Sequence, residues 1–421
     1  MFIHIDIDTF FASAHRIGTN IYDDIPIAVG GRSNLSIFDT AKQNRKISGI
    51  AGAFSSSILS YNKNKSFEEY FIDKDGRIRG IVTTASYEAR AYGVKTAMSI
   101  SEALKLCPDL IVLPPNYPLY HELSYQLKKL LEKNIPIVSQ FSIDEFFCDI
   151  SGYIDDDKAV AFALNLQALV YRELEIPVSI GICKAKMLSK VATNYAKPYG
   201  VKYIQKNQIN EFIKNINISK FPGIGKGYFK KLSALNIKNL IDIKQHKATL
   251  YSWGKQGIWL YQATQGLDTN TLVIDNQNRK SISISRTFDA IYDRVEIQRR
   301  LAVLCRHISF LCQNRSLYPT CFELKFIYEH GLKNRNNHKI YEPYSEIVFR
   351  KTIKKLFNDT DTNISRAITY LNITVSKFHD KKAKNTLFEE KSNNIDIYIH
   401  TIRQKYGIDM FKFASELNNL P

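Results

Sequence analysis

The sequence predicts an α+β protein built from more than one domain. Its 421 residues exceed the length at which a single hydrophobic core usually stops growing, about 250 to 300 residues. Hydrophobic residues make up 44% of the chain and charged residues 24%, as expected for a globular protein. Strand-like and helix-like stretches occur together in both halves, so each half should mix sheet and helix.

The first block, residues 1–200, indicates an α+β unit of the βαββαβ kind. Apolar runs with period-two alternation predict strands, and apolar residues three and four apart predict helices. The expected strands are 2–8, 25–31, 81–84, 110–113, 138–143, 146–150 and 177–183, and the expected helices are about 10–17, 87–92, 101–105, 118–133 and 158–173.

The remaining chain predicts a helical module and a second α+β unit. Residues 201–265 contain short helical patterns, and residues 268–280 form a polar linker. Beyond the linker we expect strands 281–288, 321–328, 346–349 and 367–375, with helices 295–313 and 351–357. An acidic, Asn-rich tail covers residues 385–421.

The net charge of +17 is concentrated in the middle of the chain. Residues 1–200 are neutral, 201–275 carry +7, 276–384 carry +11 and 385–421 carry −1. A basic half beside a neutral half is typical of a protein that grips a phosphate backbone. Basic surfaces kept only for solubility remain an alternative, but they would not require such segregation.

The chain has no sign of secretion or membrane insertion. Its first residues run straight into a strand pattern, and no apolar run is long enough to cross a bilayer. The six cysteines form no CxxC pair, so neither a zinc site nor a disulfide framework is indicated. We expect a soluble, cytoplasmic protein with no membrane partner.

Two acidic sites lie within apolar strand patterns. Asp6 and Asp8 flank one residue of the first strand and therefore share a face, while Asp144 and Glu145 lie at the tip of a strand hairpin. Carboxylates in apolar surroundings are costly unless they are paired or bind a metal. Neighbouring strands could unite Asp6, Asp144 and Glu145 into an all-oxygen magnesium site. Alternatively, Asp8 and Asp149 cap strands and the adjacent pair merely occupies a turn.

Four segments resemble signature motifs of Y-family translesion DNA polymerases, most like the bacterial DNA polymerase IV type. The first three are Asp6–Ser13, Thr84–Arg90 and Ser142–Glu145, in the family's order. The fourth runs from Ile180 to Pro198 and includes Lys190 and Lys197. The resemblance covers nearly the whole chain and implies a template-directed, low-fidelity DNA polymerase acting in DNA damage tolerance.

The resemblance implies a two-metal active site. Asp6 and Asp144 would ligate two Mg²⁺ ions, Glu145 would complete the site near the primer 3′-hydroxyl, and the Ile7 carbonyl would add a ligand. Asp8 matches a common family aspartate and is expected to be structural.

The nucleotide contacts are also implied by the resemblance. Tyr87 and Arg90 stand three residues apart on one helical face, so both can reach one triphosphate, and Lys197 matches a third contact. Phe11 falls at the steric-gate position that rejects a 2′-hydroxyl. Without the motif context, Arg90 would be a solvated arginine and Phe11 a core residue.

Two DNA contacts are expected in the basic segments. Gly223, Gly225 and Lys226 resemble the hairpin of a helix-hairpin-helix, whose backbone amides donate to phosphate. Arg286, in a strand that resembles the start of the family's little finger, is the expected template contact. The alternative is a strand whose alternating serines simply face solvent.

The tail contains a short peptide that resembles a sliding-clamp motif. Leu387 and Phe388 would be its apolar contacts, and Asn385 stands where the family form usually begins with Gln. The alternative is that both apolar residues only anchor the tail.

The implied architecture is a right-hand polymerase with a ferredoxin-like palm, inserted fingers, a helical thumb and an α+β little finger, acting as a monomer on primer-template DNA and deoxynucleoside triphosphates. The expected boundaries are palm 1–31 and 96–200, fingers 32–95, thumb 201–267, linker 268–280, little finger 281–384 and tail 385–421. Residues 32–80 depart from the family, which has only a short loop there, and their function is not predicted.

Two other functions are compatible with parts of the same sequence. A nucleotide cyclase would have a similar two-metal palm but would need no basic thumb or second basic unit. A non-catalytic DNA-binding scaffold could keep the fold, but it would have no need to retain Asp6, Asp144 and Glu145.

Overall fold

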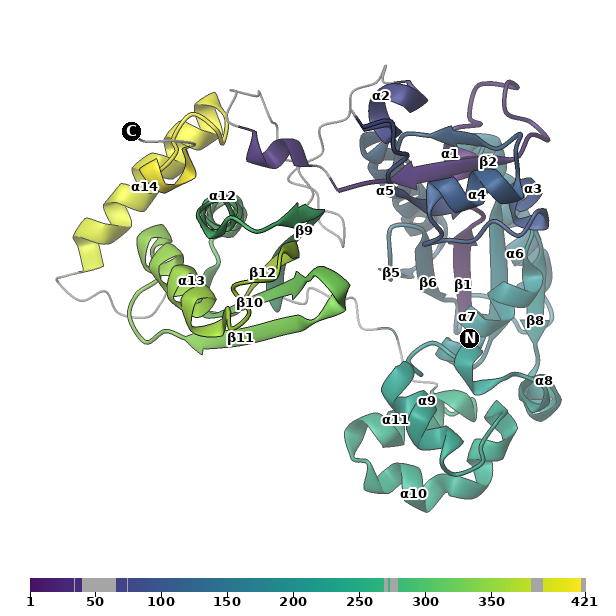
Figure 1. Cartoon of the computed structure of the whole chain (residues 1–421). Helices are drawn as coiled ribbons and strands as arrows, with labels where there is room; N and C mark the ends of the chain where they lie inside the picture. Colours follow the sequence, from purple (N-terminus) through teal and green to yellow (C-terminus); the bar gives the residue numbers. More distant parts are fainter. Residues whose placement is uncertain are drawn as a thin grey trace. The chain divides into compact units, whose positions relative to one another are not determined.

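The computed structural model describes residues 1–33, 35–39, 66–73, 75–268, 272, 279–379 and 389–417, without side chains for 389–394. The chain forms two compact units. Unit 1 comprises Met1–Gly31 and Lys63–Asn276, and unit 2 comprises Arg32–Asn62 and Gln277–Pro421. The predicted mixture of helix and sheet is confirmed in both units (Figure 1).

A five-stranded sheet is the centre of unit 1. Its order is β5-β6-β1-β7-β8, where β1 pairs antiparallel with β6 and β7, and β7 pairs parallel with β8. Every residue of β1 and β7 is buried, so both faces of the sheet are covered there. The strands are β1 (Phe2–Ile7), β5 (Ile137–Gln140), β6 (Glu145–Asp149), β7 (Val178–Cys183) and β8 (Val201–Ile204).

Three helices pack on this sheet. They are α5 (Tyr117–Asn134), α6 (Ala159–Leu174) and α7 (Lys186–Ala196), of which α7 contacts β1, β7 and β8. Gly181 in β7 lets the α7 backbone approach closely, because a Cβ there would lie 2.1 Å from the Ser189 carbonyl oxygen. The close approach fixes α7, and with it Lys190 and Lys197, beside the central strands.

A smaller sheet in unit 1 has the order β3-β2-β4. Phe71 packs against Gly30 so closely that a Cβ at that glycine would lie 2.5 Å from the ring. The elements are α1 (Phe10–Ala14), β2 (Ile27–Gly31), α2 (Phe67–Phe71), β3 (Ile81–Ala85), α3 (Tyr87–Ala91), α4 (Ile100–Leu106) and β4 (Ile111–Leu113).

The predicted helical module completes unit 1. Its core, which includes Ile213, Leu232 and Leu260, is continuous with Val191 and Leu188 of α7. Its elements are η2 (Lys206–Gln208), α8 (Ile209–Lys214), η3 (Ile218–Lys220), α9 (Lys226–Ser233), η4 (Leu240–His246), α10 (Lys247–Ser252) and α11 (Lys255–Thr264), where η denotes a 3-10 helix.

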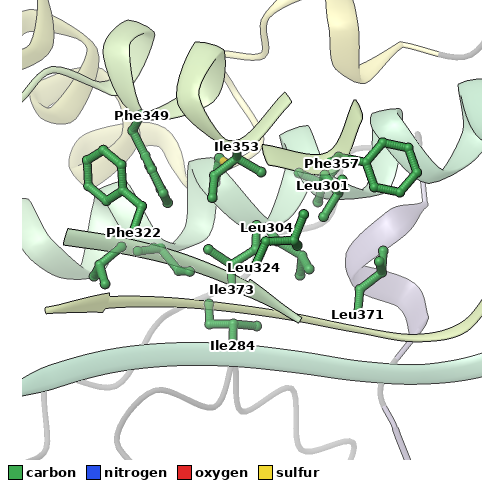
Figure 2. Packing of buried hydrophobic residues seen from close by; sticks show 14 of the residues in the cluster. Ile284, Leu301, Leu304, Phe322, Leu324, Phe349, Ile353, Phe357, Leu371 and Ile373 are labelled. Atoms are coloured by element: carbon green, nitrogen blue, oxygen red, sulfur yellow. The ribbon is translucent and has the colours of Figure 1, made fainter. Parts of the chain in front are cut away.

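Unit 2 is an antiparallel sheet of order β11-β10-β12-β9 with helices packed on one face. Figure 2 shows how apolar residues of the strands, such as Ile284, Leu324 and Ile373, meet those of the helices, such as Leu304 and Ile353. The elements are η1 (Leu35–Phe38), β9 (Ser281–Ile291), α12 (Arg294–Gln313), β10 (Tyr318–Tyr328), η5 (Glu329–Gly331), β11 (Lys333–Lys339), α13 (Glu346–Thr360), β12 (Ile368–His379), α14 (Glu389–Tyr406) and η6 (Ala414–Glu416).

One predicted strand is wrong and two strands were not predicted. Residues 346–349 are the first turn of α13, where the Ser345 side chain caps the helix by accepting from the Val348 amide at 3.2 Å. β11 lacks apolar alternation because its side chains are almost all exposed, so only its pairing with β10 defines it. β8 is a four-residue strand that follows the Pro198 turn.

Across the described ranges, no helix has both the length and the apolar character needed to span a bilayer. The domain boundaries drawn from the sequence stay predictions.

Candidate active site

The central sheet brings the three predicted carboxylate residues together. Asp6 lies directly opposite Glu145 in the pairing of β1 with β6. The Ile7 amide donates to the Asp144 carbonyl at 3.0 Å, which fixes the tip of the β5–β6 hairpin against β1. The Phe141 amide donates to the Glu145 carbonyl at 2.9 Å and keeps that tip tight.

Burial and neighbouring carboxylate charge raise the proton affinity of Asp6 and Asp144. Burial raises the pKa of Asp6 to about 7, and the neighbouring Asp144 and Glu145 charges act in the same direction, while Lys197 opposes them. Burial also raises the pKa of Asp144, against a hydrogen bond from Ser142. Crowded, desolvated carboxylates are relieved by a hard divalent cation, so the oxygen donors present fit a metal of the Mg²⁺ kind.

Two lysines pair with these carboxylates in this conformation. Lys197 Nζ lies 2.5 Å from Asp6 Oδ1, and Lys190 Nζ forms an ion pair with Glu145 Oε1. Within the described ranges no three His, Cys, Asp or Glu side chains form a preassembled metal cluster. A cation that bound Asp6 and Glu145 would therefore displace both ammonium groups from these oxygens.

Lys190 and Ser142 are site residues to which the sequence analysis gave no role. Lys190 lies on α7 and Lys197 is the C-cap residue that follows this helix, and their separation of seven residues, about two helical turns, could have indicated a shared partner. The Ser142 hydroxyl donates to Asp144 Oδ1 at 2.5 Å and so orients that carboxylate.

Asp8 has a different environment from Asp6. Its side chain is buried and accepts hydrogen bonds from the Ser179 hydroxyl at 2.8 Å, the Tyr199 amide at 2.7 Å and the Tyr87 hydroxyl at 3.1 Å. These three donors occupy the carboxylate, which supports a structural role. Asp8 thereby holds Tyr87 in place, and burial together with the Asp8 charge raises the pKa of the Tyr87 phenol.

Tyr87 and Arg90 share one face of α3, as their spacing predicts. The Arg90 guanidinium carbon lies 5.3 Å from the centroid of the Tyr87 ring, and Arg90 Nε donates to the Ala85 carbonyl at 3.0 Å. Ser86 caps the helix by accepting from the Ala89 amide. Arg90 is exposed, so its remaining donors are available to an anionic ligand.

Phe11 is held rigidly by neighbouring rings. It is 8% exposed, stacks on Tyr120 with centroids 4.1 Å apart and planes 10° apart, and meets Tyr117 edge-on at 6.2 Å. Such a ring is a fixed wall rather than a mobile side chain.

Gly223, Gly225 and Lys226 lie at the N-terminus of α9. Gly223 has φ of 96°, and a Cβ there would lie 2.7 Å from the Trp259 ring, so glycine is needed on both counts. Gly225 is the N-cap of α9 and Lys226 its first residue, and both are exposed.

Arg286 lies in β9, where Ile282 and Ile284 are buried and Ser281 and Ser283 are exposed. It pairs with buried Leu371 and is in line with Ile284 and Phe288, on the face that the helices cover. Its Nη1 donates to the Ser285 carbonyl at 2.7 Å. Leu387 and Phe388, the predicted clamp contacts, lie outside the described residues.

Known proteins are similar to this chain in both sequence and fold. The profile of the impB/mucB/samB family matches residues 5–194, and that of the family's C-terminal domain matches residues 279–387. The DNA polymerase IV of Mannheimia succiniciproducens is 29% identical over 74% of this chain and 77% of its own. The DNA polymerase IV of Shewanella denitrificans is 27% identical over 83% of this chain and 89% of its own.

Solved structures of the same fold are more distant in sequence. A Y-family DNA polymerase chimera of Dbh and Dpo4 covers 90% of this chain and 98% of its own at 21% identity, with a TM-score of 0.68. The insertion ternary complex of Dbh DNA polymerase covers the same shares at 20% identity, with a TM-score of 0.55.

The fold and the acidic sheet define the class: a right-hand polymerase whose palm carries carboxylates on adjacent strands. Within this class, the chain belongs to the impB/mucB/samB family, the Y-family of DNA polymerases.

Proposed function

We propose that this chain is a template-directed, low-fidelity DNA polymerase that adds deoxynucleotides to a primer 3′ end during translesion synthesis. The observation that carries the proposal is the pairing of Asp6 with Glu145, beside Asp144, on the central sheet of unit 1. Family membership supports the same activity.

Dependence on a divalent metal fits the family and the carboxylates. We further propose two Mg²⁺ ions, held by the side chains of Asp6, Asp144 and Glu145 and by the Ile7 carbonyl. Paired ions of this kind stabilise the attacking and leaving oxygens of a phosphoryl transfer.

The protein's own residues would position the substrate. Tyr87 and Arg90 on α3 would bind the triphosphate, with Lys197 as a third contact after its release from Asp6. Phe11, fixed by Tyr120, would exclude a 2′-hydroxyl by its bulk.

Primer-template DNA and deoxynucleoside triphosphates are the proposed partners. The exposed N-terminus of α9, with Gly223, Gly225 and Lys226, would bind a backbone phosphate. In unit 2, Arg286 would contact the template from β9, which is an edge strand of the sheet, although its side chain starts on the face that the helices cover. The opposite strand face adds Lys325 and Arg335, the latter 66% exposed on β11. A sliding clamp bound through Leu387 and Phe388, a monomeric state and a cytoplasmic location complete the proposal.

Primer extension separates this function from a DNA-binding scaffold. The native chain and Asp144→Asn are incubated with a primer-template duplex, Mg²⁺ and single deoxynucleotides. We expect extension by the native chain alone, with the templated nucleotide favoured and DNA affinity unchanged in the variant. Tight, salt-sensitive DNA binding without extension by the native chain would favour the scaffold, and conversion of a free triphosphate without DNA would favour a cyclase.

A further inference from the structure

The segment directly after β2 is part of unit 2 rather than unit 1. Residues 32–62 group with unit 2, although β2 itself belongs to the small sheet of unit 1. The 3-10 helix η1 (Leu35–Phe38) lies in this segment and contacts α12. Ile37 and Phe38 are 2% and 4% exposed, in one core cluster with Ile284, Phe288 and Leu301. The first described part of the insertion therefore contributes residues to the hydrophobic core of unit 2.

Polar contacts fix the same segment at both ends. Arg299 Nη1 donates to the Phe38 carbonyl at 3.0 Å, and Arg299 is itself 8% exposed and paired with Glu296. At the other end, the Ser33 hydroxyl accepts from the Thr287 amide at 3.2 Å. Since β9 is an edge strand, its outward backbone groups need such partners from outside the sheet.

A cluster of two aromatic rings and one guanidinium group adds to these contacts. The Arg300 guanidinium carbon lies 4.6 Å from the ring centroids of both Phe38 and Phe288, and the two rings meet at right angles with centroids 6.3 Å apart. Arg300 is kept in this position by an ion pair with Glu296 at 2.6 Å. One ring of this cluster comes from the insertion and the other from β9, so the insertion supplies one of the two rings that the guanidinium contacts.

The chain therefore passes from unit 1 to unit 2 directly after Gly31, long before the polar linker 268–280. Four Cα-to-Cα steps join Gly31 to Leu35, and an extended chain of that length spans at most about 14 Å. While η1 stays in the core of unit 2, this short connection limits how far that part of unit 2 can move from the end of β2.

We propose that η1 is an intramolecular docking segment, which holds unit 2 to strand β2 independently of the linker. Its docking site is the surface formed by α12 and β9, with Arg299, Arg300, Phe288 and the Thr287 amide as the main contacts. Repositioning of unit 2 beyond the reach of the short connection would then require η1 to leave this site. The proposal concerns the insertion itself and stands apart from the catalytic activity.

Cutting the linker in the folded protein tests the proposal. Residues 273–278 are replaced by a protease recognition sequence, the full chain is folded and cut, and the fragments are separated by size-exclusion chromatography. We expect the two fragments of the otherwise native chain to elute together, because the first still supplies η1 to the second. The Ile37→Asp/Phe38→Ala variant should release the C-terminal fragment.

Val295→Asp is the matched control, since Val295 lies on α12 and is 77% exposed. Its fragments should stay together as in the native chain. If the double variant fails to fold, Phe38→Ala alone is tested, with release on dilution at least about tenfold faster than for Val295→Asp. Separation of the native fragments after cutting, or retention of the C-terminal fragment by the docking variants, would overturn the proposal.

Discussion

At the scale of single residues, Phe11 shows why a site position needs its neighbours to be understood. The sequence supplied its place in a motif, while the structure supplies the rigidity, because Tyr120 stacks on the ring at 4.1 Å. A wall that cannot move discriminates by size, whereas a mobile ring would yield to a slightly larger sugar.

Shortening this ring should admit ribonucleotides. We predict that Phe11→Val lowers the preference for deoxynucleotides over ribonucleotides by about a hundredfold, within the range that a change of pocket volume usually produces. The measurement is the ratio of kcat/KM for the two sugars on one template. Phe10→Leu, which changes the buried neighbour in α1, is the control and should keep the preference. An unchanged ratio for Phe11→Val would remove this residue from the gate.

Residue identity alone could not separate Asp6 from Asp8. Their period-two spacing predicts a shared face, but β1 ends at Ile7, and the hydrogen bonds that occupy Asp8 come from Ser179, Tyr199 and Tyr87, which are distant in sequence. Similarly, the lysine partners of Asp6 and Glu145 depend on how closely α7 packs on β7. Gly181 permits this close packing, but the sequence alone does not show which backbone approaches Gly181.

At the scale of secondary-structure elements, α7 begins without a side-chain cap of its own. Ala185 is its N-cap residue, and the Asp268 carboxylate instead accepts from the Met187 amide at 2.8 Å. Burial raises the pKa of Asp268 to about 7. Between about pH 4 and about pH 7, the Asp268 carboxyl is protonated in the folded chain and ionised in the unfolded chain. Its contribution to the free energy of unfolding therefore falls as the pH rises through this range.

Asp268→Asn should remove that pH dependence. The amide oxygen can still accept from Met187 but carries no buried charge. We predict that the variant gains thermal stability relative to the native chain between about pH 5 and about pH 8. The check is the difference between the two unfolding midpoints at each pH. A difference that stays constant would contradict the assignment of this slope to Asp268.

Helix α14 is attached to α13 by buried charge. Arg403 is 1% exposed and pairs with Glu346 at 2.5 Å, while Arg350 links Glu346 to Glu416 at 2.6 Å on each side. Removing one member of a buried ion-pair network leaves the charges of its partners buried without enough opposite charge beside them. The sequence analysis saw only an acidic tail here, because pairing between residues 57 positions apart leaves no local pattern.

We predict that Arg403→Met lowers the stability of unit 2 by about 3 kcal/mol. Native-state hydrogen exchange of peptides from α13 measures the change directly. Lys405→Met, on the exposed side of the same helix, should leave the exchange within about 0.5 kcal/mol of the native value. Equal effects of the two substitutions would show that the buried pair adds nothing specific.

At the scale of the whole molecule, most of the architecture follows from patterning and charge. Strand and helix periodicities predict most elements of both units, and the segregation of charge predicts that residues 201–384 bind DNA. Pattern fails for β11, whose side chains are almost all exposed, and for η1, whose two buried side chains are too few to give a period. Both elements are defined by partners elsewhere in unit 2.

The basic segments predict a steep salt dependence of DNA binding. Residues 201–275 and 276–384 carry net charges of +7 and +11, so several phosphate contacts should release counterions on binding. We expect the affinity for primer-template DNA to fall at least about a hundredfold between about 50 and 200 mM salt. Fluorescence anisotropy provides the measurement, and an affinity that hardly changed would argue against a phosphate-gripping role.

The measurement that tests the central claim most directly compares Asp6→Asn with Asp8→Asn in single-turnover primer extension. The claim is that Asp6 binds metal at the reacting centre whereas Asp8 only holds the structure around it. We predict that Asp6→Asn slows extension by at least about a thousandfold, or about 4 kcal/mol, at unchanged DNA affinity. Asp8→Asn should stay within about tenfold of the native rate, because its amide oxygen can still accept from the Ser179 hydroxyl and the Tyr199 amide while its NH2 donates to the Tyr87 hydroxyl. Equal losses in both variants, or extension by Asp6→Asn at the native rate, would contradict the account.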